Sequence, residues 1–259
     1  MVSFLRPFKP LIDWVVTLIL WTHFTLGFCI FFSPRYVWTW LRASDREAAF
    51  QRLNHRYFRS FFRLVRWITP GLSLRIDAEV RTVRSAVIVC NHLSYLDPIL
   101  LISLFEKQKT IVKSVFFRVP IFGWVLRRSG YIPSKTGGDY TSLMIRNIET
   151  IREYLAAGGN LFIFPEGTRS RTGKLGPFNK GAFSIARYCR APVVCLAIRH
   201  TDRLFIPGRF RFNTCIPNVL SVARIGSFDP DYGDPAFRLG DLIREIRALY
   251  ERRQAQDSD

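Results

Sequence analysis

The pattern of apolar and polar positions divides the chain into an N-terminal helical part and a longer alternating part. From Leu11 to Phe32 the chain is almost entirely apolar, with Asp13 and His23 among the few polar residues. A helix of this length spans about 33 Å, which matches the hydrocarbon thickness of a bilayer. The run is long for a signal peptide, and no small-residue cleavage motif follows it. It predicts a retained membrane segment that either spans the bilayer or re-enters it.

A second helical pattern covers about Ser44 to Ile68 and ends before Pro70. Arginines recur at steps of three and four on one face, and apolar residues recur with the same spacing on another. A soluble helix with a solvated charged face is one interpretation. Because the stripe holds almost no acid, we favour a basic amphipathic helix in the headgroup region of an anionic leaflet. The stripe consists of Arg52, Arg56, Arg59, Arg63 and Arg66.

Past Gly71, short apolar runs typical of strands alternate with helical patterns. The alternation predicts an α/β fold with a mixed, largely parallel central sheet flanked by helices, preceded by an N-terminal two-helix membrane-anchoring segment. We therefore expect a membrane segment with its basic helix at 1–70 and an α/β domain at 71–259. The expected strands are Leu72–Ile76, Ala86–Cys90, Thr110–Lys113, Asn160–Phe164, Pro192–Ile198 and Leu220–Ile225, and the expected helices are Pro98–Phe105, Pro120–Arg128, Tyr140–Ala157, Lys180–Cys189 and Phe237–Arg253.

The formal net charge of +18 predicts that the protein binds an acidic partner. Basic residues outnumber acidic ones by 10 to 3 in residues 1–70 and by 28 to 17 in residues 71–259. The sequence has no zinc-finger spacing, RNA-binding motif or helix-turn-helix signal, which argues against nucleic acid. Together with the apolar N-terminal run, the charge favours anionic membrane lipids as partners.

Five cysteines occur, none in a Cys-x-x-Cys pair or with metal-ligand spacing. Cys90 and Cys195 lie inside apolar runs, which is typical of buried, reduced thiols. We expect no metal, and a reducing compartment that puts the α/β domain on the cytoplasmic face of its membrane.

The motif Asn91-His92-x4-Asp97 directly follows an apolar run. A histidine at the end of a buried strand, with a carboxylate in the next turn, is a compact general base with its orienting partner. The two side chains can meet only across a turn, because five residues of one helix would set them about 140° apart. The structural alternative makes Asp97 only an N-cap, with Pro98 at the first helical position, and His92 only a strand-end histidine.

A second motif, FPEGTRS at residues 164–170, leaves the carboxyl end of an expected strand, where α/β sheets bind ligands. Gly167 would let the backbone approach a ligand, and Arg169 offers a bidentate fork for phosphate. An ordinary pair of Glu166 with Arg169 that fixes a turn is the structural alternative.

In this order and spacing, the two motifs resemble those of the glycerolipid (lysophospholipid) acyltransferases, typified by 1-acylglycerol-3-phosphate acyltransferases. The first matches the family's N-H-x4-D, and the second matches its F-P-E-G-T-R-S completely. The sequences KGAF at 180–183 and APVV at 191–194 also resemble the family's downstream pattern. The resemblance covers roughly residues 72–225.

One motif departs from the family. Its second motif usually ends in an arginine linked to the phosphate of the acceptor, whereas here Gly130-Tyr131-Ile132 is followed by Pro133 to Thr136. Lys135 offers a point charge in its place. The acceptor implied by the resemblance is therefore 1-acylglycerol-3-phosphate, another lysophospholipid, or a lyso-aminolipid such as lyso-ornithine lipid.

The resemblance implies transfer of an acyl group from a thioester, acyl-CoA or acyl-carrier protein, to the free hydroxyl of a lyso-glycerolipid, with no cofactor besides this co-substrate. His92 would take the hydroxyl proton and Asp97 would orient the imidazole, so no serine or cysteine nucleophile is needed. The expected substrate-binding residues are Asn91, Lys113, Lys135, Glu166, Gly167, Thr168 and Arg169, although a strand-end lysine such as Lys113 is more often only solvated.

Two other classes of protein share part of this pattern. A non-catalytic lipid-binding module would keep the membrane segment but would not need His92, Asp97 and Glu166 together. A lipid hydrolase would direct the same histidine and aspartate at water, but the sequence has no G-x-S-x-G elbow for a serine version.

Overall fold

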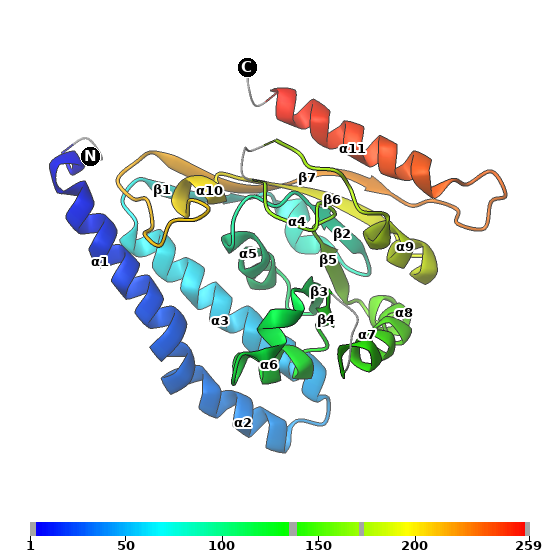
Figure 1. Cartoon of the computed structure of the whole chain (residues 1–259), viewed down its shortest axis with the longest axis horizontal. Helices are drawn as coiled ribbons and strands as arrows, with labels where there is room; N and C mark the ends of the chain where they lie inside the picture. Colours follow the sequence, from blue (N-terminus) through cyan, green and yellow to red (C-terminus); the bar gives the residue numbers. More distant parts are fainter. Residues whose placement is uncertain (1–3, 135–138, 171–173, 257–259) are drawn as a thin grey trace. The chain divides into compact units, whose positions relative to one another are not determined.

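The computed structural model describes residues 4–134, 139–170 and 174–256 (Figure 1). The chain folds into two compact units, each assembled from separate stretches of sequence. The first comprises Met1–Ile76, Leu93–Glu106 and Ile198–Val222, and the second comprises Asp77–His92, Lys107–Ala197 and Ala223–Asp259.

The first unit begins with one continuous helix from Arg6 to Arg42 (Figure 1). It extends the apolar run predicted at 11–32 by several residues at both ends. By its length and composition it is the one helix in the described part of the chain that qualifies for crossing a membrane. Its consecutive parts are η1 (Arg6–Phe8), α1 (Lys9–Thr22), the π-helical η2 (His23–Phe32) and α2 (Ser33–Arg42).

Helix α3 (Arg46–Ile68) matches the second predicted helix. Its five stripe arginines are exposed, whereas its aromatic face is buried and packs against η2, α2 and α5 (Leu96–Leu104). The Tyr57 hydroxyl donates to the Phe24 carbonyl at 2.8 Å, and the Tyr36 hydroxyl donates to Asn54. Protein side chains therefore cover these rings, and the arginine face is the one that α3 leaves exposed.

A short parallel pair of strands completes the first unit. β1 (Leu72–Ile76) pairs with β7 (Asn218–Phe228) from Leu72 opposite Asn218 to Ile76 opposite Val222. The short helix α10 (Thr201–Leu204), which the sequence pattern did not predict, belongs to the same unit.

The strands are hydrogen-bonded in the order β1-β7-β6-β2-β5-β3-β4. In the second unit, β2 is flanked by β5 and β6, and β3 by β5 and β4, and all four of these pairs are parallel. A largely parallel sheet with flanking helices agrees with the predicted α/β class. The strands are β2 (Val87–Cys90), β3 (Gln108–Val112), β4 (Ile132–Pro133), β5 (Asn160–Ile163) and β6 (Val193–Arg199).

The core of the second unit lies where β2, β5 and β6 are covered by α8, α9 and α11. From α11, the buried Tyr250 hydroxyl lies 2.7 Å from the Val89 carbonyl and 2.9 Å from the Leu196 carbonyl. Burial raises the pKa of Tyr250 well above its ordinary value. The helices of this unit are α4 (Ala78–Thr82), η3 (Ser114–Arg118), α6 (Phe122–Arg128), α7 (Asp139–Glu149), α8 (Ile151–Ala156), α9 (Lys180–Cys189) and α11 (Leu239–Gln256).

Candidate active site

The candidate residues of the second unit follow the carboxyl ends of neighbouring parallel strands. Asn91 and His92 follow β2, the FPEGTRS segment follows β5, and Lys113 follows β3. Val87 lies opposite Leu161 in the register of β2 and β5, so both strands end at the same edge of the sheet. Lys135 lies outside the described residues.

His92 is held against the loop after β5 by its backbone and by its ring. Its amide donates to Glu166 Oε1 at 3.0 Å, and its carbonyl accepts from the Ser170 amide at 2.8 Å. Its imidazole stacks on Phe164 with 4.2 Å between ring centroids and 25° between planes. The half-buried ring is thus fixed at the sheet edge by the motif that lies more than 70 residues further along the chain.

Glu166 ties three parts of this edge together. Its side chain is buried, and while Oε1 accepts from His92, Oε2 accepts from the Gly176 amide at 2.8 Å. A Cβ at Gly176 would stand 3.1 Å from that oxygen, so the approach requires glycine or a small shift. Both carboxylate oxygens therefore bind backbone N–H groups.

Helix α11 supports the loop that carries Gly176. The Arg247 guanidinium donates to the Gly176 carbonyl at 3.0 Å and lies 5.8 Å from the centroid of the Phe178 ring. Next to it, the Asn179 amide donates to the Pro165 carbonyl at 2.7 Å. Gly167 has φ +67°, and a Cβ there would lie 2.8 Å from the Asn179 side chain. Glycine is thus needed at Gly167 for both conformation and space.

Asp97 is fully buried in the first unit and has its own set of partners. Oδ2 accepts from the Leu93 and Ser94 amides at 2.6 and 2.7 Å, and Oδ1 accepts from the Thr201 hydroxyl at 2.5 Å. The carboxylate therefore fixes the turn that directly follows His92. Helix α5 begins one residue earlier, at Leu96.

The prediction that Asp97 is the N-cap of this helix is wrong. Tyr95 occupies the N-cap position, and Asp97 lies in the first turn. Its carboxylate bends back toward amides that precede the helix, which need an acceptor as much as the first helical amides do. Thr201, from α10, is a partner that the sequence did not reveal, because nothing local links it to a residue 104 positions away.

Burial sets the protonation of two thiols in the second unit. It raises the pKa of Cys195 to about 12 and that of Cys189 to about 11. Both are therefore neutral thiols near pH 7, which is the wrong state for a nucleophile. In the described stretches, no three His, Cys, Asp or Glu side chains gather in a way that would hold a metal ion.

The remaining candidates differ in exposure. Gly167, Thr168 and Lys113 are exposed, while Asn91 and Arg169 are half-buried. An exposed Lys113 is compatible both with a substrate contact and with simple solvation. The loop anchors Gly176 and Arg247 were missed by the sequence analysis, since no motif marks them.

Known proteins resemble this chain in sequence and in fold. A family model described as Acyltransferase matches residues 73–199. The chain is 38% identical over 122 residues to the chloroplastic 1-acyl-sn-glycerol-3-phosphate acyltransferase BAT2 of Brassica napus, covering 47% of this chain and 35% of that protein. It is 33% identical over 190 residues to the 1-acyl-sn-glycerol-3-phosphate acyltransferase of Cocos nucifera, covering 73% and 59% of the two chains.

A solved structure shares the whole fold. The 1-acyl-sn-glycerophosphate acyltransferase PlsC of Thermotoga maritima superposes with a TM-score of 0.69 over 93% of this chain and 94% of that one, at 22% identity. The chain thus carries a match to the Acyltransferase model and shares the fold of a known acyltransferase. In sequence it resembles the glycerolipid acyltransferases, and it spans about a third of the length of the first plant relatives it matches.

Proposed function

We propose that this protein is an O-acyltransferase that moves a fatty acyl group from a thioester to the free hydroxyl of a lyso-glycerolipid. 1-Acylglycerol-3-phosphate is the foremost acceptor, and phosphatidic acid is then the product. The observation that carries the proposal is the fixation of His92 on Phe164 and Glu166, at the edge where the FPEGTRS loop also begins. The names of the relatives support the choice of acceptor.

In the proposed reaction the acceptor hydroxyl attacks the thioester carbonyl directly. His92 takes the hydroxyl proton as the new carbon–oxygen bond forms, which gives a tetrahedral intermediate and an imidazolium. The intermediate collapses with cleavage of the carbon–sulfur bond, and the imidazolium returns its proton to the departing thiolate. The products are an ester and a free thiol, so no covalent acyl-enzyme is required.

The two carboxylates have different proposed roles. Asp97 orients the imidazole and stabilises the imidazolium, through the turn that its own hydrogen bonds fix. Glu166 acts as a positioning residue, because its oxygens hold the backbone of His92 and Gly176. Arg169 and Lys113, with Asn91, Gly167, Thr168 and Lys135, form the proposed surface for the anionic head of the acceptor.

The proposed donor is acyl-CoA or acyl-carrier protein. The proposed location is a membrane, with the α/β domain on its cytoplasmic side. The long apolar helix Arg6–Arg42 supports the proposed membrane location. The net charge of +18 supports an anionic lipid surface as the partner.

The test is a product assay with the full chain. Radiolabelled acyl-CoA or acyl-carrier protein is offered with 1-acylglycerol-3-phosphate, lysophosphatidylcholine, lysophosphatidylglycerol or lyso-ornithine lipid, and the products are separated. We expect labelled phosphatidic acid as the main product. Labelled ornithine lipid would identify lyso-ornithine lipid as the acceptor, the alternative suggested by the atypical motif at Pro133–Thr136. Free labelled fatty acid would identify a hydrolase. Binding of the lyso-lipids without any product would identify a lipid-binding module.

A further inference from the structure

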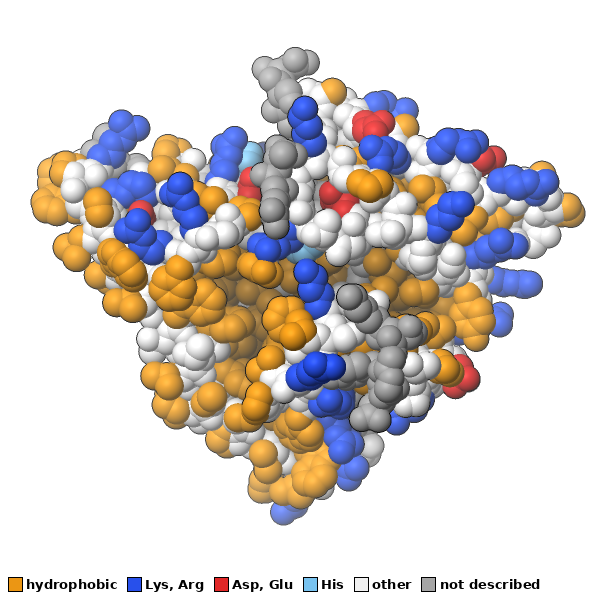
Figure 2. All heavy atoms as spheres, viewed as in Figure 1, with side chains coloured by type: hydrophobic (Ala, Val, Ile, Leu, Met, Phe, Trp, Pro, Cys, Tyr) orange, Lys and Arg blue, Asp and Glu red, His pale blue; other side chains and the backbone are white. Residues whose placement is uncertain are grey.

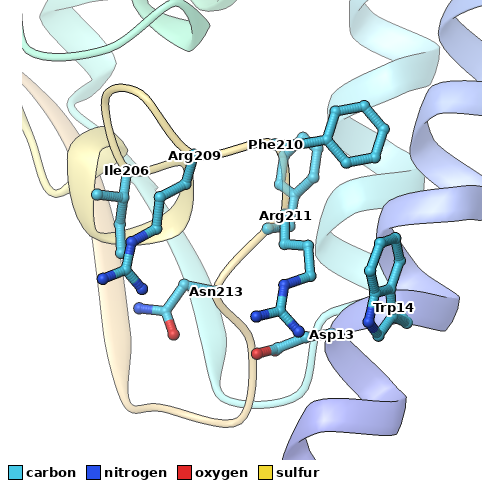
Figure 3. A pocket seen from close by; sticks show the side chains of 8 residues that line it. Asp13, Trp14, Ile206, Arg209, Phe210, Arg211 and Asn213 are labelled. Atoms are coloured by element: carbon cyan, nitrogen blue, oxygen red, sulfur yellow. The ribbon is translucent and has the colours of Figure 1, made fainter.

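In the first unit, basic side chains meet an apolar surface beside helix α1. A pocket of about 320 Å³ lies between helix α1 and the loop 206–213 (Figure 3). We call it the α1 pocket. Asp13 and Trp14 line it from the helix, and Arg209, Phe210 and Arg211 line it from the loop. None of these residues belongs to the proposed active site.

Asp13 joins the far end of the loop to the helix. Its Oδ1 accepts from the amide and the hydroxyl of Thr214, at 2.8 and 2.7 Å. Lys9 lies 2.8 Å from Asp13 Oδ2 and donates at 2.8 Å both to the Asn213 side chain and to the Thr214 carbonyl. Among the described residues that line the α1 pocket, Asp13 is the one acid, and it is thus neutralised by a lysine from its own helix.

Two further contacts hold the middle of the loop. The Phe212 amide donates to the Thr17 hydroxyl at 2.9 Å, and the Trp21 indole donates to the Phe210 carbonyl at 3.3 Å. The Phe210 ring stacks on Trp21 with 5.5 Å between centroids and 5° between planes. The backbone of the loop is therefore ordered on α1 before a ligand arrives, which lowers the entropic cost of binding.

The two arginines of the loop are available to an anion. In Figure 3 both guanidinium groups lie on the same side of the loop as Asn213. Arg211 lies 5.3 Å from the centroid of the Trp14 ring. Within the ranges 4–134, 139–170 and 174–256, neither arginine forms an ion pair with a carboxylate. Two guanidinium forks on either side of Asn213, beside a neutralised acid, favour a phosphate ligand.

The surroundings indicate which phosphate this is. Leu11, Leu18 and Phe210 are 64%, 56% and 57% exposed, and hydrophobic side chains gather along α1 and α2 in Figure 2. The α1 pocket lies at the beginning of the helix that is long and apolar enough for a bilayer. Tryptophans such as Trp14 and Trp21 are typical at the level of the headgroups. A soluble phosphate would gain nothing from this apolar surface.

We propose that the α1 pocket binds the phosphate of an anionic membrane phospholipid, with Arg209 and Arg211 on the phosphate and the acyl chains along α1. The site fixes the depth at which the first unit meets the bilayer. This inference rests on the membrane location in the proposed function, but not on acyl transfer.

The probe is dihexanoylphosphatidylglycerol, which is anionic but is neither the proposed acceptor nor its product. It is titrated into the full chain in neutral detergent micelles, and tryptophan fluorescence reports occupancy because Trp14 lines the pocket. We expect the double variant R209Q/R211Q to bind it about tenfold more weakly or worse. The control R52Q/R59Q removes the same charge from the exposed face of α3 and should change the affinity less than about twofold.

The remaining arms identify the ligand and the site. Inorganic phosphate should compete only at about 100-fold higher concentration, because it lacks acyl chains, and dihexanoylphosphatidylcholine should bind weakly. If the two double variants lose affinity for the probe equally, or if R209Q/R211Q loses none, the α1 pocket is not the binding site. Inorganic phosphate as potent as the lipid would overturn the lipid as its ligand.

The active-site variant separates this inference from the proposed function. H92A should bind the probe like the wild type, and loss of binding in H92A would instead put the lipid in the active site and contradict the inference. A wild type that binds the lipid through Arg209 and Arg211 but transfers no acyl group would refute the proposed function alone.

Discussion

Asp97 in the first unit and Glu166 in the second are both buried carboxylates that accept backbone amides, but their oxygens are used differently. At Asp97 one oxygen accepts both amides, and the other meets the hydroxyl of Thr201. At Glu166 each oxygen accepts one amide. A hydroxyl can reverse its role from donor to acceptor, whereas an amide N–H cannot. The two sites should therefore respond differently when the carboxylate becomes a carboxamide.

The largest effect of such a change is expected in the activity of Asp97→Asn. Its carboxamide oxygen can keep both backbone amides, and its NH2 group can donate to Thr201, so the fold should lose less than about 1 kcal/mol. The negative charge that orients and stabilises the imidazolium is lost, and we expect turnover to fall about 100-fold or more. Steady-state kinetics and urea unfolding of the same preparation measure both quantities. Undiminished turnover would limit Asp97 to a structural role.

Glu166→Gln should show the opposite balance. One of its two amide partners must face the NH2 group, which leaves a buried donor without an acceptor and costs about 1–3 kcal/mol of unfolding free energy. Turnover should fall with it, because the His92 amide or the Gly176 loop is released. Glu153→Gln, at an exposed position on α8, is the matched control and should change neither quantity. Full stability of the Glu166 variant would contradict its role as a backbone anchor.

Substitutions of Thr201 test the hydrogen bond between its hydroxyl and Asp97 Oδ1. Thr201→Val keeps the shape but removes the donor to Oδ1, and we expect a loss of about 1–3 kcal/mol in unfolding free energy. Thr201→Ser retains the hydroxyl and should recover most of that loss. If valine and serine behave alike in urea unfolding, the hydrogen bond to Asp97 contributes nothing.

The smallest effect concerns alkaline pH and the buried thiol of Cys195 in β6. Burial raises the pKa of Cys195 from 9.0 to about 12 in the folded protein. The unfolded chain therefore loses this proton first, and the associated stability is complete below pH 9 and is lost as the pH rises toward 12. Between neutral pH and pH 10, the Cys195→Ala variant should therefore lose about 1 kcal/mol less unfolding free energy than the wild type. Parallel pH profiles for the two proteins would contradict the buried thiol as a contributor.

Much of the fold follows from local sequence patterns. The limits of β1 and α9 were predicted to the residue, and α3 to within two residues, because apolar periodicity and flanking breakers mark them. The alternation of strands and helices was sufficient for the α/β class. The short elements α4, η3, β4 and α10 were missed, since two to five residues carry too little periodicity.

The site was only partly predictable, for a related reason. His92 and the FPEGTRS loop could be found, because each is a local motif at a strand end. Their mutual arrangement depends on the pairing of β2 with β5, and the anchors Thr201 and Arg247 approach from distant segments. The partners of the aromatic face of α3 could not be predicted, because such a face looks the same in sequence whether lipid or protein covers it.

The most direct test of His92 as the general base is the rate of acyl transfer by His92→Ala, with and without added imidazole. Transfer from a labelled thioester to 1-acylglycerol-3-phosphate should fall about 100- to 10,000-fold in the variant, with an unchanged unfolding transition. Added imidazole, as a diffusible base, should restore part of the lost rate. A variant that transfers at the wild-type rate, without imidazole, would contradict His92 as the general base.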